Sequence, residues 1–181
     1  MSAAPQSYRT YYDGVQKSLH WIVALSVLTI IPVGITMGRV QGDIQNTLFN
    51  FHKSLGVLIL SVMTLRLIYR LTKGVPKDTE LPAFFRVAGS ATHWILYILL
   101  FVTPIMGYVA NSAYGAPTPF FGLFELPPIV AKNEALSETL FARHKFLGFT
   151  TGVFAAMHIG AGLFHYFIRR DGVLQRMLPG R

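Results

Sequence analysis

Residues 143–170 read RHKFLGFTTGVFAAMHIGAGLFHYFIRR, a run long and apolar enough to cross a bilayer as a helix, yet it carries three histidines. At about 100° per residue, His158 lies about 40° around the helix axis from His144, and His165 about 20° from His158. All three imidazoles therefore share one stripe of the helix. The positions between them on this stripe hold the small residues Gly148, Thr151, Ala155 and Gly162. Such a stripe leaves room for a broad, flat group against the helix.

The composition predicts a membrane protein with one domain, residues 1–181. Hydrophobic residues make up 52% of the chain and charged residues 13%, whereas soluble proteins average about 25% charged. The scarcity of charge leaves four apolar windows of about 20 residues, roughly 19–37, 48–69, 88–110 and 140–168. We therefore predict an all-α bundle of four transmembrane helices, with a long loop over about 111–139. Residues 1–16 are polar and no cleavage site follows, so we expect no cleaved signal peptide.

The basic residues predict the orientation of the bundle. The chain has a net charge of +8, and its basic residues concentrate before the first window, around the second connection and after the last window: Arg9, Lys17; Arg70, Lys73, Lys77, Arg86; and Arg169, Arg170, Arg176, Arg181. The positive-inside rule places both termini and the second connection of this multi-pass protein in the cytoplasm. Because the charges flank the windows and form no continuous stripe, they argue against nucleic-acid binding.

The chain contains no cysteine. This excludes disulfides, iron–sulfur clusters on thiolates and covalent C-x-x-C-H attachment of haem. A haem in this protein would be held by axial side chains alone.

The histidines sort by depth in the membrane. His52 and His144 both open their windows from the periplasmic side, so they lie at equal depth and can face each other. His158 lies roughly 21 Å further in along its helix. His20, in the cytoplasmic half, is the natural partner of His158, but His93 has a depth similar to that of His20.

Two short patterns recur and suggest two related helical hairpins. His20-Trp21-Ile22 is echoed by His93-Trp94-Ile95, and the H-K-x-L-G run at His52 is echoed at His144. This repeat alone would pair His20 with His93, so the residues leave the inner pairing open.

Two separate levels of imidazoles favour two haems over a single metal ion. Histidines at span ends are also common as interfacial residues, but His158 lies inside a span, where an ionisable side chain is costly and usually functional. Zinc and copper also accept histidine, yet ligands fourteen residues apart on one helix cannot share one ion. Ligation by two imidazoles leaves no open position on the iron, so we expect haems that carry electrons.

The chain resembles the bacterial cytochrome b561 family in its four spans and in the placement of its histidines: His20, His52, the H-x-x-x-G element at His144, His158 and His165. The resemblance covers nearly the whole chain and implies two haems b. It further implies that His52 and His144 hold the outer haem iron and that His20 and His158 hold the inner one. Some stand-alone family members resemble a superoxide oxidase, which passes electrons from periplasmic superoxide to ubiquinone. Others are cytochrome b subunits that relay electrons for a partner dehydrogenase.

Charged residues near these levels suggest further roles. Lys53, Lys145 and Arg143 place positive charge beside the outer level, where they would attract superoxide or neutralise haem propionates. Arg66 and Arg70 share the helix face of His52 and are expected to pair with the propionates of the inner haem. A ubiquinone site near the inner level would use His165, His93 and Lys17.

The expected activity is therefore that of a superoxide:ubiquinone oxidoreductase. The alternative is a non-catalytic cytochrome b subunit between a dehydrogenase and the quinone pool. The expected partners are membrane lipid, ubiquinone and superoxide or another periplasmic donor, with a second copy of the chain or a partner dehydrogenase as further candidates.

Overall fold

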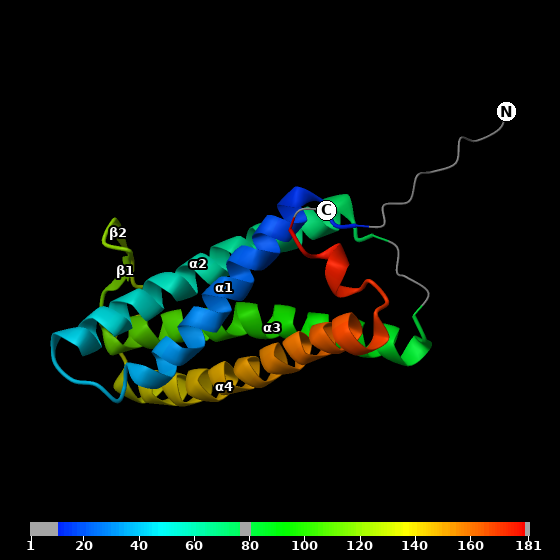
Figure 1. Cartoon of the computed structure of the whole chain (residues 1–181). Helices are drawn as coiled ribbons and strands as arrows, with labels where there is room; N and C mark the ends of the chain where they lie inside the picture. The colour runs from blue at the N-terminus through cyan, green and yellow to red at the C-terminus, as the bar shows by residue number, and fades with distance from the viewer. Residues whose placement is uncertain (1–10, 77–80, 180–181) are drawn as a thin grey trace.

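The computed structural model describes residues 11–76 and 81–179, and within them four long helices run side by side (Figure 1). They are α1 (Gly14–Thr36), α2 (Asp43–Lys73), α3 (Ala83–Tyr114) and α4 (Glu134–Phe164). All four are long and apolar enough to cross a membrane. The predicted all-α membrane bundle is confirmed. Arg9, Lys77 and Arg181, which contribute to the predicted orientation, lie outside the described residues.

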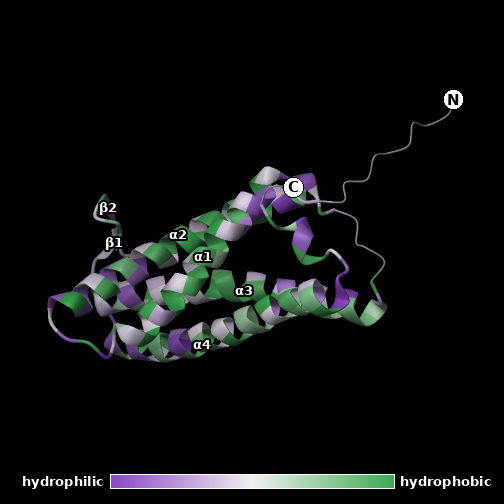
Figure 2. Ribbon diagram, in the orientation of Figure 1, coloured by the Kyte–Doolittle hydropathy of each residue, from purple (hydrophilic) through white to green (hydrophobic). Residues whose placement is uncertain are grey.

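Large apolar side chains cover the outside of the bundle. Leu25 is 61% exposed, Ile98 60% and Phe149 73%. Apolar residues line the middle of the helices, whereas hydrophilic residues gather toward their ends (Figure 2). In water this surface would be very costly, so it is the surface that contacts lipid.

The helices extend beyond the apolar windows because polar turns continue them past the bilayer core. α1 begins with a capping box, in which the Asp13 carboxylate accepts from the Gln16 N–H and the Gln16 side chain accepts from the Asp13 N–H. The Gln16 amide also donates to the Gly74 carbonyl at 2.9 Å, which ties the start of α1 to the end of α2. α1 and α3 both continue through an internal proline, Pro32 and Pro104 respectively.

The packed core lies mainly between α1, α2 and α3. Its buried members are Val23, Val27, Leu55, Ile59, Val62, Met63, Tyr97 and Leu100. α4 packs chiefly along α3, and Ala155 joins it to the core. α4 thus closes the bundle from one side while few of its own side chains are buried.

The connection between α3 and α4 contains a β-hairpin that the sequence did not predict. β1 (Thr118–Phe120) pairs antiparallel with β2 (Phe124–Leu126), and both lie at the end of the bundle that also holds the α1–α2 turn (Figure 1). α4 begins at Glu134, before the predicted apolar window over about 140–168. The connection therefore runs from 115 to 133, and it is shorter than the predicted loop over about 111–139.

The C-terminal segment folds back onto the opposite end of the bundle (Figure 1). After α4 comes a π-helical turn, η1 (His165–Arg169), and then a short 3-10 helix, η2 (Leu174–Arg176). The Trp21 indole N–H donates to the Met177 carbonyl at 2.9 Å, so the segment is held against the start of α1.

Candidate functional site

Two histidines from different helices face each other at the hairpin end of the bundle. His52 on α2 and His144 on α4 have ring centroids 6.0 Å apart, with their planes at 83°. Each lies about ten residues inside its helix, so regular backbone on both sides holds it in place. These are the two residues predicted to share the outer level.

The surroundings of His144 leave one particular ring nitrogen available. Its Nδ1 lies 2.9 Å from the Thr103 carbonyl oxygen. A carbonyl can only accept a hydrogen bond, so Nδ1 carries the proton and Nε2 keeps a free lone pair. A histidine that donates one N–H to a backbone carbonyl in this way is the usual form of a metal ligand.

The inner level contains three histidines. The ring centroids of His20 and His158 are 6.2 Å apart, and those of His93 and His158 are 5.2 Å apart. Both predicted partners of His158 therefore contact it. Tertiary packing brings these three side chains together from α1, α3 and α4.

The two levels fit a flat metal group between facing imidazoles. Two metal–nitrogen bonds of about 2 Å, with about 1.1 Å from each nitrogen to its ring centre, separate the ring centroids by about 6 Å. The 6.0 Å of His52–His144 and the 6.2 Å of His20–His158 match this spacing, whereas the 5.2 Å of His93–His158 is too short.

One further observation agrees with this fit. Within residues 11–76 and 81–179, no three His, Asp or Glu side chains gather closely enough to hold an ion between them. The donor set is therefore imidazoles in opposed pairs, which is the axial ligand set of a six-coordinate haem.

The two predicted propionate partners lie beside the inner histidines. The Arg66 guanidinium lies 5.4 Å from the ring centroid of Tyr97, and that of Arg70 lies 5.7 Å from the same ring. Arg66 is also close enough to His20, His93 and His158 to interact with them electrostatically. Positive charge at the inner level thus comes from α2.

The three predicted outer cations have different surroundings. The Lys53 ammonium donates to the Pro117 carbonyl at 2.8 Å and so helps to anchor the hairpin connection. Arg143 and Lys145, on either side of His144, are exposed. The exposed charge beside the outer level is therefore carried by α4.

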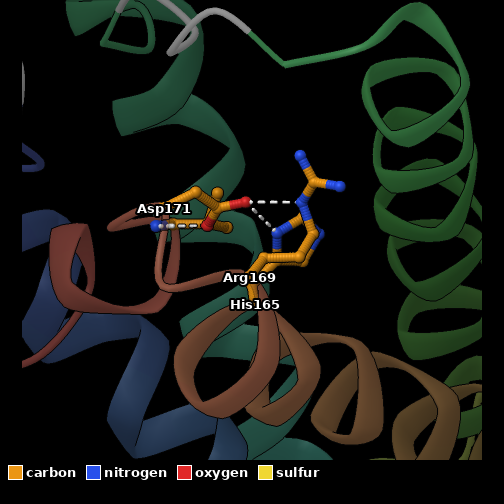
Figure 3. A network of polar contacts seen from close by, with 4 residues as sticks. His165, Arg169 and Asp171 are labelled. Carbon is orange, nitrogen blue, oxygen red and sulfur yellow. Dashed lines mark hydrogen bonds and ion pairs between the residues drawn. The ribbon is translucent and has the colours of Figure 1, made fainter.

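His165 lies in a polar network of its own (Figure 3). Its Nδ1 is 2.6 Å from an Asp171 carboxylate oxygen, which also accepts from Arg169 Nε at 2.9 Å. The Arg169 guanidinium in turn lies 4.4 Å from the ring centroid of Phe85. Partial burial raises the pKa of Asp171, but the hydrogen bonds from His165 and Arg169 outweigh it and hold that pKa below its usual value.

The regular stripe predicted for α4 does not continue to His165. The π-helical turn begins at this residue, so the backbone widens there, and the buried imidazole packs against Phe85 and Phe164. The three residues predicted for a quinone site have different neighbours: His93 packs on His158, His165 on Asp171, and Lys17 is buried with its ammonium 6.0 Å from the Tyr11 ring centroid.

Four residues that shape these sites were not predicted from the sequence. Thr103 orients His144 through its carbonyl, and Asp171 is the partner of His165. Gly34 and Gly107 lie against the rings of His52 and His144. The glycines could have been found from the sequence, since each follows the histidine of the repeated His-Trp-Ile pattern at the same distance. The hydrogen bond to the Thr103 backbone carbonyl could not, because it does not depend on the side chain at that position.

The prokaryotic cytochrome b561 family profile matches residues 11–180. The chain belongs to the prokaryotic cytochrome b561 family. It is 31% identical over 173 residues to cytochrome b561 homolog 2 of Escherichia coli K12, covering 92% of this chain and 90% of that protein.

Two further relatives carry different names. A probable superoxide oxidase, CybB, of Yersinia pestis is 28% identical over 169 residues, which are 93% of this chain and 96% of the relative. Cytochrome b562 of Cereibacter sphaeroides is 25% identical over 179 residues, with 94% and 96% covered.

Membership confirms the predicted family and the broad function. The protein is a membrane cytochrome of the b type, in contact with lipid, that binds haem b and transfers electrons across the membrane.

Proposed function

We propose that this cytochrome b561 oxidises superoxide at the periplasmic face of the bacterial inner membrane and reduces ubiquinone, using two haems b. His52 and His144 hold the outer iron, and His20 and His158 the inner one. The observation that supports this assignment best is the presence of two opposed imidazole pairs, at 6.0 and 6.2 Å, on separate levels of one bundle. His144 and His158 are fourteen residues apart on α4, which separates the levels by about 21 Å.

The bound haems would supply one-electron chemistry at both levels. The chain's own contribution is to hold the imidazoles in opposed pairs. The Thr103 carbonyl keeps the proton of His144 on Nδ1, so that Nε2 is presented as a ligand. The uninterrupted helices α2 and α4 position the outer pair with little freedom to rearrange.

The outer surface suits an anionic substrate. Arg143 and Lys145 expose positive charge next to His144, and Lys53 adds charge beside His52. Such a field raises the encounter rate of a small anion. In the proposed reaction two superoxide ions each lose one electron and become dioxygen, while one ubiquinone takes up both electrons and two protons to become ubiquinol.

The inner end supplies groups for quinone reduction. Ubiquinol formation needs protons, and we assign His165, His93 and Lys17 to this site. The His165–Asp171 pair can hold a proton at Nδ1, buried near the cytoplasmic end in our assignment of the topology. Arg66 and Arg70 would pair with the propionates of the inner haem, since their guanidinium groups already lie at that level.

The test is a dithionite-reduced minus oxidised spectrum of the purified protein, with haem quantified per chain. We expect two low-spin haems b in the wild type, and one in each of the variants His144→Ala and His158→Ala. Superoxide from xanthine oxidase should then reduce the wild-type haems, and ubiquinone should reoxidise them. A single haem per wild-type chain would overturn the assignment.

The second candidate function is a non-catalytic subunit that relays electrons for a partner dehydrogenase. One feature of the outer hairpin favours this relay function: the side chains of Phe121, Leu123 and Phe124 are exposed, and Leu123 is 76% exposed. Apolar side chains at this end of the bundle suit the docking of a donor protein. Two bound haems that superoxide reduces slowly or not at all would favour the relay.

A further inference from the structure

Two glycines lie directly against the outer histidines. A methyl group on Gly107 of α3 would stand 2.8 Å from His144 Cε1 and 2.9 Å from its Nδ1. A methyl group on Gly34 of α1 would stand 2.9 Å from His52 Cε1 and 3.3 Å from its Nδ1. Both imidazoles therefore occupy space that any other residue would fill with its own Cβ.

The two contacts have the same orientation. In each, Cε1 is the ring atom nearest the glycine and Nε2 is the most distant of the three ring atoms near it, at 3.5 Å for Gly107 and 4.0 Å for Gly34. The Cε1 corner of each ring thus rests on the neighbouring backbone, and Nδ1 is the nearer of its two nitrogens. A ring seated in this way presents the same nitrogen from both helices.

The two glycines are also equivalent positions of the internal repeat. Gly34 follows His20 by fourteen residues, and Gly107 follows His93 by fourteen. Each first helix of a hairpin therefore carries an inner histidine and, about 21 Å away, an outer glycine. Each second helix carries the H-K-x-L-G run whose histidine rests on that glycine. The same close approach therefore occurs in both halves of the chain.

We propose that Gly34 and Gly107 are positioning residues for the outer metal ligands. By lacking Cβ, they let His52 and His144 seat against α1 and α3, which directs both Nε2 atoms to one iron between them. The inference can be tested by haem binding, which also depends on the proposed ligand assignment, and by stability, which depends on the contact between glycine and imidazole.

The chain offers matched controls for the first experiment. Gly89 on α3 and Gly160 on α4 are helical glycines with no atom within 4 Å of an added Cβ. Gly34→Ala and Gly107→Ala are compared with Gly89→Ala and Gly160→Ala in the purified protein, by haem per chain and by electron paramagnetic resonance. Loss of an orienting group typically weakens metal binding about 10- to 100-fold.

We expect the first two variants to lose the outer haem and keep the inner one, which is also the result expected for His144→Ala. Any outer haem that remains should have shifted g values, because these report how the two imidazole planes are oriented. The control variants should keep two haems with wild-type spectra. Two unperturbed haems in both Gly34→Ala and Gly107→Ala would overturn the proposal.

The second experiment is a double-mutant cycle on the purified full-length protein as it is isolated. Gly107→Ala is measured in the wild-type background and together with His144→Ala, by unfolding in a denaturing detergent. With the imidazole present the new methyl group should destabilise the fold. Without the imidazole it should be neutral or stabilising, because alanine favours a helix over glycine.

The two experiments separate the two possible failures. An equal effect of Gly107→Ala with and without the His144 ring would refute the positioning role. A second outcome is that Gly107→Ala is destabilising only when the His144 ring is present, while the wild-type protein binds a number of haems other than two. That combination would refute the ligand assignment and support the contact between the ring and Gly107.

Discussion

Replacing Ser54 by alanine should release the outer hairpin from α2. The Ser54 side chain is 2% exposed, and its hydroxyl oxygen accepts from the Phe121 N–H at 2.9 Å. Its single proton goes either to the Pro119 carbonyl at 2.9 Å or to the Asn50 carbonyl at 2.8 Å. Alanine fits the helix equally well but cannot form any of these hydrogen bonds with the hairpin.

The size of the effect follows from the bonds lost. The hairpin loses the bond from the Phe121 N–H and, when the hydroxyl proton goes to Pro119, a second bond, so at about 0.5–1.5 kcal/mol each the loss is about 0.5–3 kcal/mol of local stability. Since 1.4 kcal/mol is tenfold, the hairpin should open roughly 2- to 150-fold more often. The Lys53–Pro117 bond and the hydrogen bonds of the Asn111 amide, which donates to Thr118 Oγ1 at 2.8 Å, remain. We therefore expect local opening with the four helices intact.

Hydrogen exchange of a peptide covering residues 117–127, followed by mass spectrometry, measures this opening. Ser61→Ala is the matched control, because the Ser61 hydroxyl donates to the Val57 carbonyl within its own helix and lies on the exposed side. Exchange should accelerate in Ser54→Ala and stay unchanged in Ser61→Ala. A hairpin in Ser54→Ala that exchanges as slowly as in the wild type would refute the reasoning.

Three further predictions concern the two ends of the bundle. The pKa of Asp171 is lower in the folded protein than in the unfolded chain, so its carboxylate stabilises the C-terminal segment at pH values above the unfolded pKa. This stability is lost as the pH falls through the lower, folded pKa. Asp171→Asn should remove that acid dependence, measured as hydrogen exchange of residues 170–179 against pH. Trp21→Phe loses the bond to the Met177 carbonyl and should cost about 0.5–1.5 kcal/mol, seen as faster proteolysis of the same segment. The double variant Arg143→Gln/Lys145→Gln should slow haem reduction by superoxide at low salt, roughly 10-fold or more, and flatten its salt dependence; an unchanged stopped-flow rate would exclude steering by these two side chains.

Much of the fold is readable from local sequence. The four helices follow from the length of the apolar windows, and the family follows from the histidine spacing. The facing of His52 and His144 was predictable as well, because both open their spans from the same side and depth is set by distance along a helix. His165 shows the limit of this reasoning, since a regular helical period cannot foresee a π-helical turn or the carboxylate of Asp171 beyond it.

The amino-acid sequence by itself determined a lipid-exposed bundle of four helices and the levels at which its histidines lie, because bilayer thickness and helical rise act on each segment separately. Only the tertiary structure decided how the helices are rotated and packed. This decided that both His20 and His93 reach His158, with only the former at a spacing that admits a flat metal group. It also placed Gly34 and Gly107 under the outer rings. Rotation about a helix axis is set by packing between helices, which no single segment encodes.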